Sequence, residues 1–144
     1  VHQNAVIFFL SDFLNQILKN ESQQVALYQE IKFFKQKILE KKMHAHYFFL
    51  IRMLQFFGIS PLVSEEKFLN IEKGVFQEEI AEKEVDEELS SLWKKILDRE
   101  IEEAFIIEKK YRKPLLDSIL QYYKMHFPEF YSPKSLPVIL EVFE

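Results

Sequence analysis

The 144-residue sequence contains no cysteine and only two glycines, which excludes disulfide bonds, thiolate zinc sites and glycine-rich phosphate loops. Its composition, 48% hydrophobic and 29% charged, is that of a folded globular domain, and its length fits one such domain. The formal net charge of −4 disfavours a stand-alone nucleic-acid binder, because strong phosphate binders usually carry a basic face.

The sequence carries no sign of membrane insertion or secretion. No apolar run approaches the ~18 residues that a bilayer requires. Residues 1–10 lack the basic flank and small-residue cleavage site of a signal peptide. We therefore expect a cytoplasmic protein without membrane contacts. The chain begins without methionine and inside a helical pattern, so we also expect a fragment of a larger protein.

Three helices are predicted in the first part of the chain. Apolar residues recur at helical spacing over 4–19 and again on one side of a segment around 27–38. A third helix over about 43–57 is apolar almost all round, which is typical of a helix in the centre of a bundle. Gly58 suits its C-cap, and Pro61 prevents its continuation.

One short stretch, 67–77, has the pattern of a strand. Leu69 and Ile71 alternate there with residues of the opposite face, and Lys73-Gly74 suits a tight turn. We therefore predict a small β-hairpin inserted between helices.

The remainder of the chain returns to helical spacing. The acidic stretch 78–88 indicates a solvated loop or a helix start, and helix is then expected to continue to about Arg112. Pro114 fits the first position of a further helix, and a short last helix is expected at about 135–143. The predicted fold class is all-α, a single helical bundle with one small β-hairpin insertion.

The grouping that most resembles a metal site is Glu40 with His44, four residues apart on one helical face, with His46 nearby. Di-iron bundles need a Glu from each of two helices and a Glu-x-x-His pair from each of two others. Here the spacing is one residue too long and no Glu-x-x-His exists, so we predict interfacial histidines and no metal. No carboxylate is visibly forced into an apolar pocket either, so we predict that the protein is not an enzyme.

Basic residues mark two candidate contact regions. One is Lys32, Lys35, Lys37, Lys41 and Lys42, and the other is Lys109, Lys110, Arg112 and Lys113. Either set suits phosphate or an acidic peptide, and the alternative for each is an ordinary solvated helix face. Arg52 is the single charge in the apolar stretch 47–57. A guanidinium beside an exposed aromatic suits a ligand with an acidic group and an aromatic ring, although Arg52 facing only solvent is equally compatible with the pattern.

Three blocks of sequence together resemble one known family. FLIRMLQFFGISP at 49–61 resembles the F-L-x-x-L-L-x-x-L-G-Y-x-P segment of RecO proteins. FLNIEKGVF at 68–76 resembles the aromatic-led strand and acidic-x-Gly turn that follow it. LQYYKMHF at 120–127, with PKSL at 133–136, resembles the Y-Y-x-x-H and L-K-S ending. RecO proteins are bacterial recombination and DNA-repair mediators in which an N-terminal OB-fold precedes a helical domain. The resemblance implies that residues 1–144 are the helical domain alone, without the OB-fold.

The resemblance also implies a function. It implies a non-catalytic, nucleoid-associated mediator that helps to load recombinase onto gapped DNA coated by single-stranded-DNA-binding protein, together with RecR and sometimes RecF. DNA contact would lie mainly in the absent OB-fold. The four-cysteine zinc site of many relatives is lost here, which implies no cofactor. A degenerate ferritin-like metal-binding bundle and a structural adaptor bundle are the alternative functions.

The helical domain of RecO relatives captures the acidic, phenylalanine-ended tail of single-stranded-DNA-binding protein, and such a tail needs cations beside an apolar groove. We predict that Arg52, Lys41 and Lys42, near Tyr47 and Phe48, form that site. The basic residues that we predict to contact phosphate are Lys109, Lys110, Arg112 and Lys113.

Overall fold

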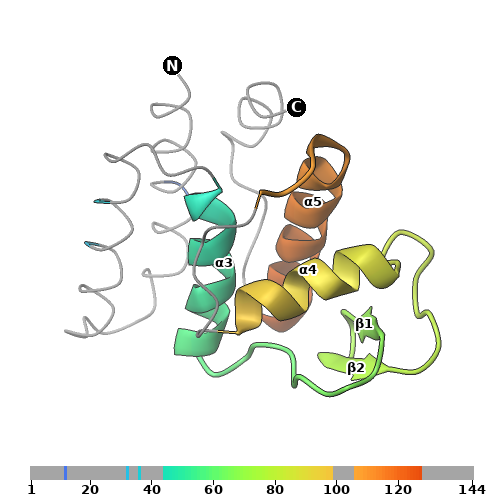
Figure 1. Ribbon diagram of the computed structural model, residues 1–144. Helices are drawn as coiled ribbons and strands as arrows, with labels where there is room; N and C mark the ends of the chain where they lie inside the picture. The colour runs from blue at the N-terminus through green and yellow to red at the C-terminus, as the bar shows by residue number, and fades with distance from the viewer. Residues whose placement is uncertain (1–11, 13–31, 33–35, 37–43, 99–105, 128–144) are drawn as a thin grey trace.

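The computed structural model describes residues 12, 32, 36, 44–98 and 106–127. Within this part of the chain the elements are, in order, α3 (Ala45–Phe56), β1 (Phe68–Asn70), β2 (Val75–Gln77), α4 (Glu87–Leu97) and α5 (Lys109–His126). In Figure 1, α4 crosses α5, and the hairpin lies beside the N-terminal half of α4. The described part is therefore mostly helical with one small antiparallel sheet. The helices predicted over 4–19, 27–38 and 135–143 lie almost entirely outside the described residues.

Helix α3 supplies the centre of the core, as its apolar pattern predicts. It contacts both α4 and α5. Seven of its hydrophobic side chains are at most 3% exposed, and they point in every direction around the helix: Tyr47, Phe48, Phe49, Leu50, Ile51, Met53 and Leu54. Burying side chains of this size is the largest favourable contribution to folding, on the order of 1.5–3 kcal/mol for each.

A Schellman motif ends α3. The Gly58 N–H donates to the Gln55 carbonyl at 3.0 Å, and the Ile59 N–H donates to the Leu54 carbonyl at 3.0 Å. Gly58 has a φ of 73°, in the left-handed region that glycine enters without steric cost. The predicted glycine cap is confirmed, and it redirects the chain toward the hairpin.

The predicted hairpin is also confirmed. Strand β1 pairs antiparallel with β2, with Leu69 opposite Phe76, and both of these side chains are buried. The connecting turn ends at Gly74, which has a φ of 66°. The Gly74 N–H donates to the Asn70 carbonyl at 2.9 Å, and the Gly74 carbonyl accepts from the Leu62 N–H at 2.9 Å.

Side chains of α4 and α5 hold this hairpin against the bundle. The Ser90 hydroxyl accepts from the Leu69 N–H at 2.9 Å. The Tyr122 hydroxyl donates to the Ile59 carbonyl at 2.5 Å, and His126 Nε2 lies 2.6 Å from the Ile71 carbonyl oxygen. The rings of Tyr122 and His126 stack at 4.1 Å between centroids. Hydrogen bonds as well as packing therefore fix the hairpin.

Helix α4 begins at the end of the acidic stretch 78–88. The Asp86 carboxylate accepts from the Leu89 N–H at 2.9 Å, which makes Asp86 the N-cap. Glu87 and Glu88 follow in the first turn, where negative charge is favourable to the helix dipole. A solvated loop and a helix start were predicted as alternatives for this stretch, and it contains both: 78–86 are not helical and α4 begins at Glu87.

The predicted boundary between the last two described helices is wrong. Helix α4 ends at Leu97, residues 106–108 are not helical, and α5 begins at Lys109. Pro114 therefore lies inside α5 instead of at its first position. Proline removes the hydrogen bond to the carbonyl four residues earlier. Pro114 and Lys110 are both exposed, so water can satisfy that carbonyl.

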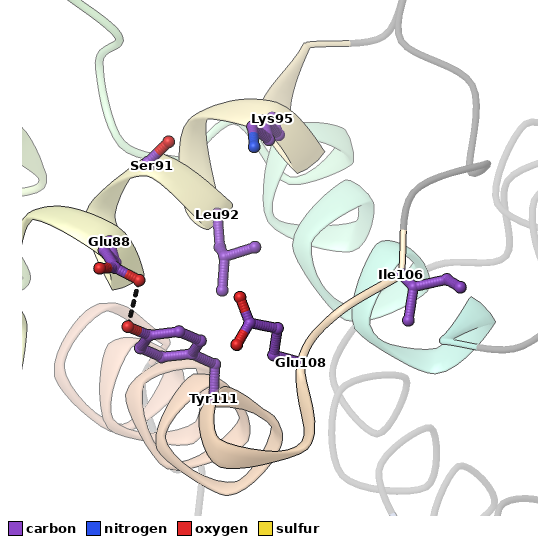
Figure 2. A pocket seen from close by; sticks show the side chains of 7 residues that line it. All are labelled: Glu88, Ser91, Leu92, Lys95, Ile106, Glu108 and Tyr111. Carbon is purple, nitrogen blue, oxygen red and sulfur yellow. Dashed lines mark hydrogen bonds between the residues drawn. The ribbon is translucent and has the colours of Figure 1, made fainter.

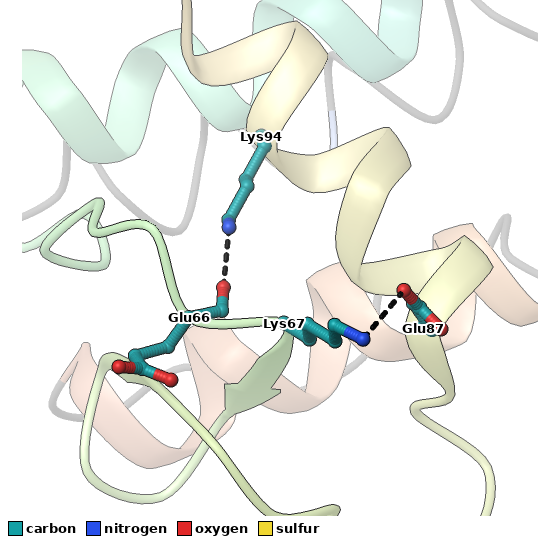
Figure 3. A network of polar contacts seen from close by, with 4 residues as sticks. All are labelled: Glu66, Lys67, Glu87 and Lys94. Atoms are coloured by element: carbon teal, nitrogen blue, oxygen red, sulfur yellow. Dashed lines mark hydrogen bonds and ion pairs between the residues drawn. The ribbon is translucent and has the colours of Figure 1, made fainter.

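The segment between α3 and β1 is attached to α4 by lysines. The Lys94 ammonium donates to the Glu66 carbonyl (Figure 3). It also lies 4.9 Å from the centre of the Phe76 ring. Lys67 Nζ lies 3.9 Å from Glu87 Oε1, with both side chains mostly exposed. Exposed pairs of this kind contribute little, about 0–1 kcal/mol. The half-buried Lys94 is therefore the stronger attachment.

Buried hydrogen bonds connect the three helices. Trp93 Nε1 donates to the Ser118 hydroxyl at 2.9 Å, and that hydroxyl donates to the Leu115 carbonyl at 2.7 Å. The Tyr123 hydroxyl donates to the Leu50 carbonyl. No helix in the described part of the chain is both long and apolar enough to cross a membrane.

The two glycines provide a matched test of the hairpin attachment. A Cβ at position 58 would meet no atom within 4 Å. Gly58→Ala should therefore lower the free energy of unfolding only through the strain of a left-handed φ, by about 1–2 kcal/mol. A Cβ at Gly74 would lie 2.9 Å from the Tyr122 hydroxyl, so Gly74→Ala should lower the free energy of unfolding by about 1 kcal/mol more, measured by urea denaturation. In a Tyr122→Phe background this excess should disappear. Equal losses for both glycines in the wild-type background would contradict the attachment.

Candidate functional site

Arg52 is half-buried on α3, and its guanidinium carbon lies 5.4 Å from the centre of the Phe48 ring. The structure therefore brings together the predicted cation and one predicted aromatic. Phe48 and Tyr47 are each only 1% exposed, however, so these two rings belong to the core and support the site from beneath. Lys41 and Lys42 lie outside the described residues.

Other aromatics near Arg52 are more accessible. Phe56 lies four residues after Arg52 and hence on the same side of α3, and it is only partly buried. The Phe57 ring meets the rings of Phe56 and Phe127 edge-on, at 5.5 Å and 5.4 Å between centroids. Our sequence interpretation assigned Phe56 and Phe57 to the core. The i, i+4 spacing from the single charge of the helix was the signal that could have placed Phe56 in the site.

The basic residues predicted to contact phosphate all lie in the first turns of α5. Lys109, Lys110 and Lys113 are exposed, and Lys110 Nζ lies 3.7 Å from the Glu108 carboxylate. Arg112 differs from them because it is half-buried and its Nε donates to the Ile107 carbonyl at 3.0 Å. The structure thus separates three surface lysines from an arginine that is directed into the fold.

Two histidines near Arg112 occupy the start of α3. His44 and His46 are 7% and 3% exposed, and the ring of His46 lies 4.1 Å from that of Tyr47. Burial, followed by the positive charges of His44 and Arg112, lowers the pKa of His46 to about 3. Burial and Arg112 lower the pKa of His44 to about 4. Both rings are therefore neutral at pH 7.

These histidines do not form part of a larger ligand cluster within the described residues. No group of three or more His, Cys, Asp or Glu side chains in that part of the chain is arranged to hold a metal ion. Glu40, the third member of the grouping considered from the sequence, lies outside it.

Curated proteins named DNA repair protein RecO match this chain over almost its full length. The RecO of Flavobacterium psychrophilum is 25% identical over 99% of the chain and 63% of its own length. The RecO of Azobacteroides pseudotrichonymphae is 27% identical over 99% of the chain and 63% of its own length. The RecO of Christiangramia forsetii is 26% identical over 96% of the chain and 61% of its own length. The chain resembles RecO throughout. It spans about 63% of the length of these relatives. No family model matches the chain, and no solved structure matches it.

The match to RecO confirms the resemblance seen in the three sequence blocks. Two of these blocks fall in well-described structure: 49–61 forms most of α3 and its glycine cap, and 68–76 forms most of the hairpin. The third block contacts both of the others. The hydroxyls of Tyr122 and Tyr123 donate to carbonyls of the first block, and His126 lies beside a carbonyl of the second. The RecO-like blocks are therefore in contact with one another in the fold.

Because two histidines are buried in the neutral form, we expect the fold to lose stability in acid. Because the pKa of His46 is lower in the folded state than its ordinary value of 6.5, the unfolded state binds more protons below pH 6.5. The free energy of unfolding should be greatest above pH 6.5 and fall toward pH 4, by about 1.4 kcal/mol per pH unit for each buried histidine. Urea denaturation of His46→Phe should show a shallower fall. Tyr47→Phe, which keeps both histidines, is the control, and an unchanged slope in His46→Phe would contradict the prediction.

Proposed function

We propose that this chain is a non-catalytic domain of a RecO-type recombination mediator that acts in DNA repair by binding partner proteins. The observation that carries the proposal is the match to DNA repair protein RecO over 96–99% of the chain. The partners that follow from it are single-stranded-DNA-binding protein, RecR and RecF, at the bacterial nucleoid. DNA contact would fall mainly to an OB-fold domain that these residues do not include.

The proposed site for the acidic tail of single-stranded-DNA-binding protein is the Arg52 surface, which we define as Arg52, Phe56 and Phe57. A terminal carboxylate can accept two parallel hydrogen bonds from a guanidinium, and the Phe48 ring beneath Arg52 limits the positions of that group. The partly buried Phe56 supplies apolar surface for a phenylalanine side chain. Lys41 and Lys42 are proposed to attract the acidic residues that precede the terminal phenylalanine of the tail.

Charge sets the expected behaviour of this complex. The chain has a formal net charge of −4, so its overall field disfavours an acidic peptide and local cations must supply the attraction. Binding should therefore depend strongly on Arg52 and weaken as salt screens it, since the screening length falls from about 10 Å at 0.1 M salt to about 3 Å at 1 M.

The test is fluorescence anisotropy of a labelled peptide that copies the acidic tail. Arg52→Ala should weaken binding about tenfold or more, because hydrogen bonds between charged groups contribute about 1.5–3 kcal/mol. Arg52→Lys should bind the peptide with an affinity between those of the wild type and Arg52→Ala, since lysine keeps the positive charge and loses the two parallel hydrogen bonds. Lys83→Ala, at an exposed lysine in the acidic stretch, is the control.

Two outcomes would contradict this site. Absence of binding to the wild-type chain at high concentration would remove tail capture from these residues. Unchanged binding by Arg52→Ala, with an unchanged melting temperature, would move the site away from Arg52. Binding of neither the tail nor RecR would favour the structural adaptor bundle, and bound iron or manganese in the purified protein would favour the ferritin-like alternative.

We also propose that the exposed lysines of α5 contact nucleic-acid phosphate. Lys109, Lys110 and Lys113 surround the N-terminus of an 18-residue helix, where backbone N–H groups and the helix dipole favour anions. Arg112 was part of this prediction, but its hydrogen bond to Ile107 gives it a separate role in the fold.

Salt dependence of oligonucleotide binding tests the lysine contact. Each phosphate contact with single-stranded DNA contributes about 0.7 to the slope of log K against log salt. Lys109→Ala/Lys113→Ala should therefore reduce that slope by about 1.4. Lys73→Ala/Lys83→Ala, at exposed positions elsewhere, should leave it unchanged. No measurable binding of wild type at low salt would exclude the contact.

A further inference from the structure

A hollow lies between the outward side of α4 and the segment that leads into α5. It has a volume of about 200 Å³ and is lined by Glu88, Ser91, Leu92, Lys95, Ile106, Glu108 and Tyr111. Figure 2 shows the Leu92 side chain pointing from α4 toward Tyr111 and Glu108. Ligand pockets for cofactors and drug-sized molecules usually measure about 300–1,000 Å³. This hollow is therefore the size for one or two side chains of a partner protein.

The lining has an apolar part and an acidic part. Leu92 is half-buried and Ile106 is 71% exposed, so together they offer apolar surface to solvent. Glu88 and Glu108 provide two carboxylates beside them. Lys95 on α4 is the single basic residue of the lining, so the formal charge of the lining is negative, and the exposed Lys110 lies next to the lining, 3.7 Å from the Glu108 carboxylate.

Tyr111 fixes the acidic rim. Its hydroxyl donates to the Glu88 carboxylate, which joins α5 to α4 across the hollow (Figure 2). The hydrogen bond to Glu88, followed by burial and by the negative charges of Glu88, Asp86 and Glu108, raises the pKa of Tyr111 to about 12. The Glu88 carboxylate is thus held in place before any partner arrives.

The chemistry of the lining selects the occupant. Inside the hollow, Glu88 and Glu108 disfavour nucleic-acid phosphate and acidic peptides, whereas the α5 lysines lie outside the lining. A metal ion would need more ligands than these two carboxylates, and no larger set of metal-binding side chains is arranged in the described part of the chain. A basic side chain next to an aliphatic one satisfies both parts of the lining, and arginine suits it best because its planar group matches carboxylates.

We infer that this hollow is a second protein-docking site, which binds an adjacent aliphatic–arginine pair on a partner protein. The aliphatic side chain packs on Leu92 and Ile106, and the guanidinium binds between Glu88 and Glu108. This surface is distinct from the Arg52 surface of the proposed function and opposite to it in charge.

The test is an NMR titration of the ¹⁵N-labelled 144-residue chain with end-blocked Leu-Arg dipeptide. Amide shifts should centre on the described residues around the hollow, in 88–95 and 106–111. Leu-Gln and Ala-Arg dipeptides should bind more weakly, because each lacks half of the match. Glu88→Gln/Glu108→Gln should weaken Leu-Arg binding about three- to fivefold, since exposed ion pairs contribute only weakly.

Matched variants separate specific docking from general attraction to an acidic protein. Glu79→Gln/Glu84→Gln removes two exposed carboxylates outside the hollow and should leave binding unchanged. Arg52→Ala should also leave it unchanged, so loss of tail binding and loss of dipeptide binding are separate results. Shifts spread over residues 78–86, or equal affinities for Leu-Arg and Leu-Gln, would overturn the inference. So would an undiminished affinity in Glu88→Gln/Glu108→Gln.

Discussion

The near-complete burial of α3 is the constraint on which the rest of the described fold depends. A helix that is apolar on all sides cannot remain at a surface, so other elements must cover each of its faces. Helices α4 and α5 both pack against it, and the hairpin in turn packs on α4. The buried hydrogen bond from the Tyr123 hydroxyl to the Leu50 carbonyl sets the position of α5 along α3. Packing supplies the stability of this arrangement, and such polar contacts select one alignment of the helices.

The surface left over from that packing carries the proposed functions. Arg52 interrupts the apolar pattern of α3 and occurs where the helix is least covered, while the side of α4 opposite its buried residues forms the acidic hollow. A basic group beside aromatics and an acidic group beside aliphatics are complementary to different partners. Electrostatic complementarity of this kind contributes to specificity and association rate more than to raw affinity. A mediator that holds two proteins at once would need two such surfaces.

Patterns within one element were predictable from the sequence, and relations between elements were not. The apolar pattern of 43–57, Gly58 and the alternation around Leu69 each report local geometry, and α3, its cap and the hairpin follow from them. The start of α5 was misjudged because residues 109–113 are basic and have no apolar period, so Pro114 was the strongest local signal. Tyr47 and Phe48 could be recognised as aromatic beside Arg52, but their burial depends on distant segments. The electrostatic effect of Arg112 on His44 and His46, and the hollow across α4 and α5, likewise required the tertiary structure.

The hydrogen bond that joins α3 to α5 has a consequence for synthesis of the protein on the ribosome. Tyr123 follows Leu50 by 73 residues. At about 5–20 residues per second, roughly 4–15 s pass between translation of these two positions. Emergence from the ribosome is separated by the same interval, so the large aromatic side chains of α3 leave it before the helix α5 that packs against them. Nascent chains with such exposed surface are prone to aggregation and are typical clients of chaperones. Folding of this domain is therefore tied to the completion of its C-terminal third.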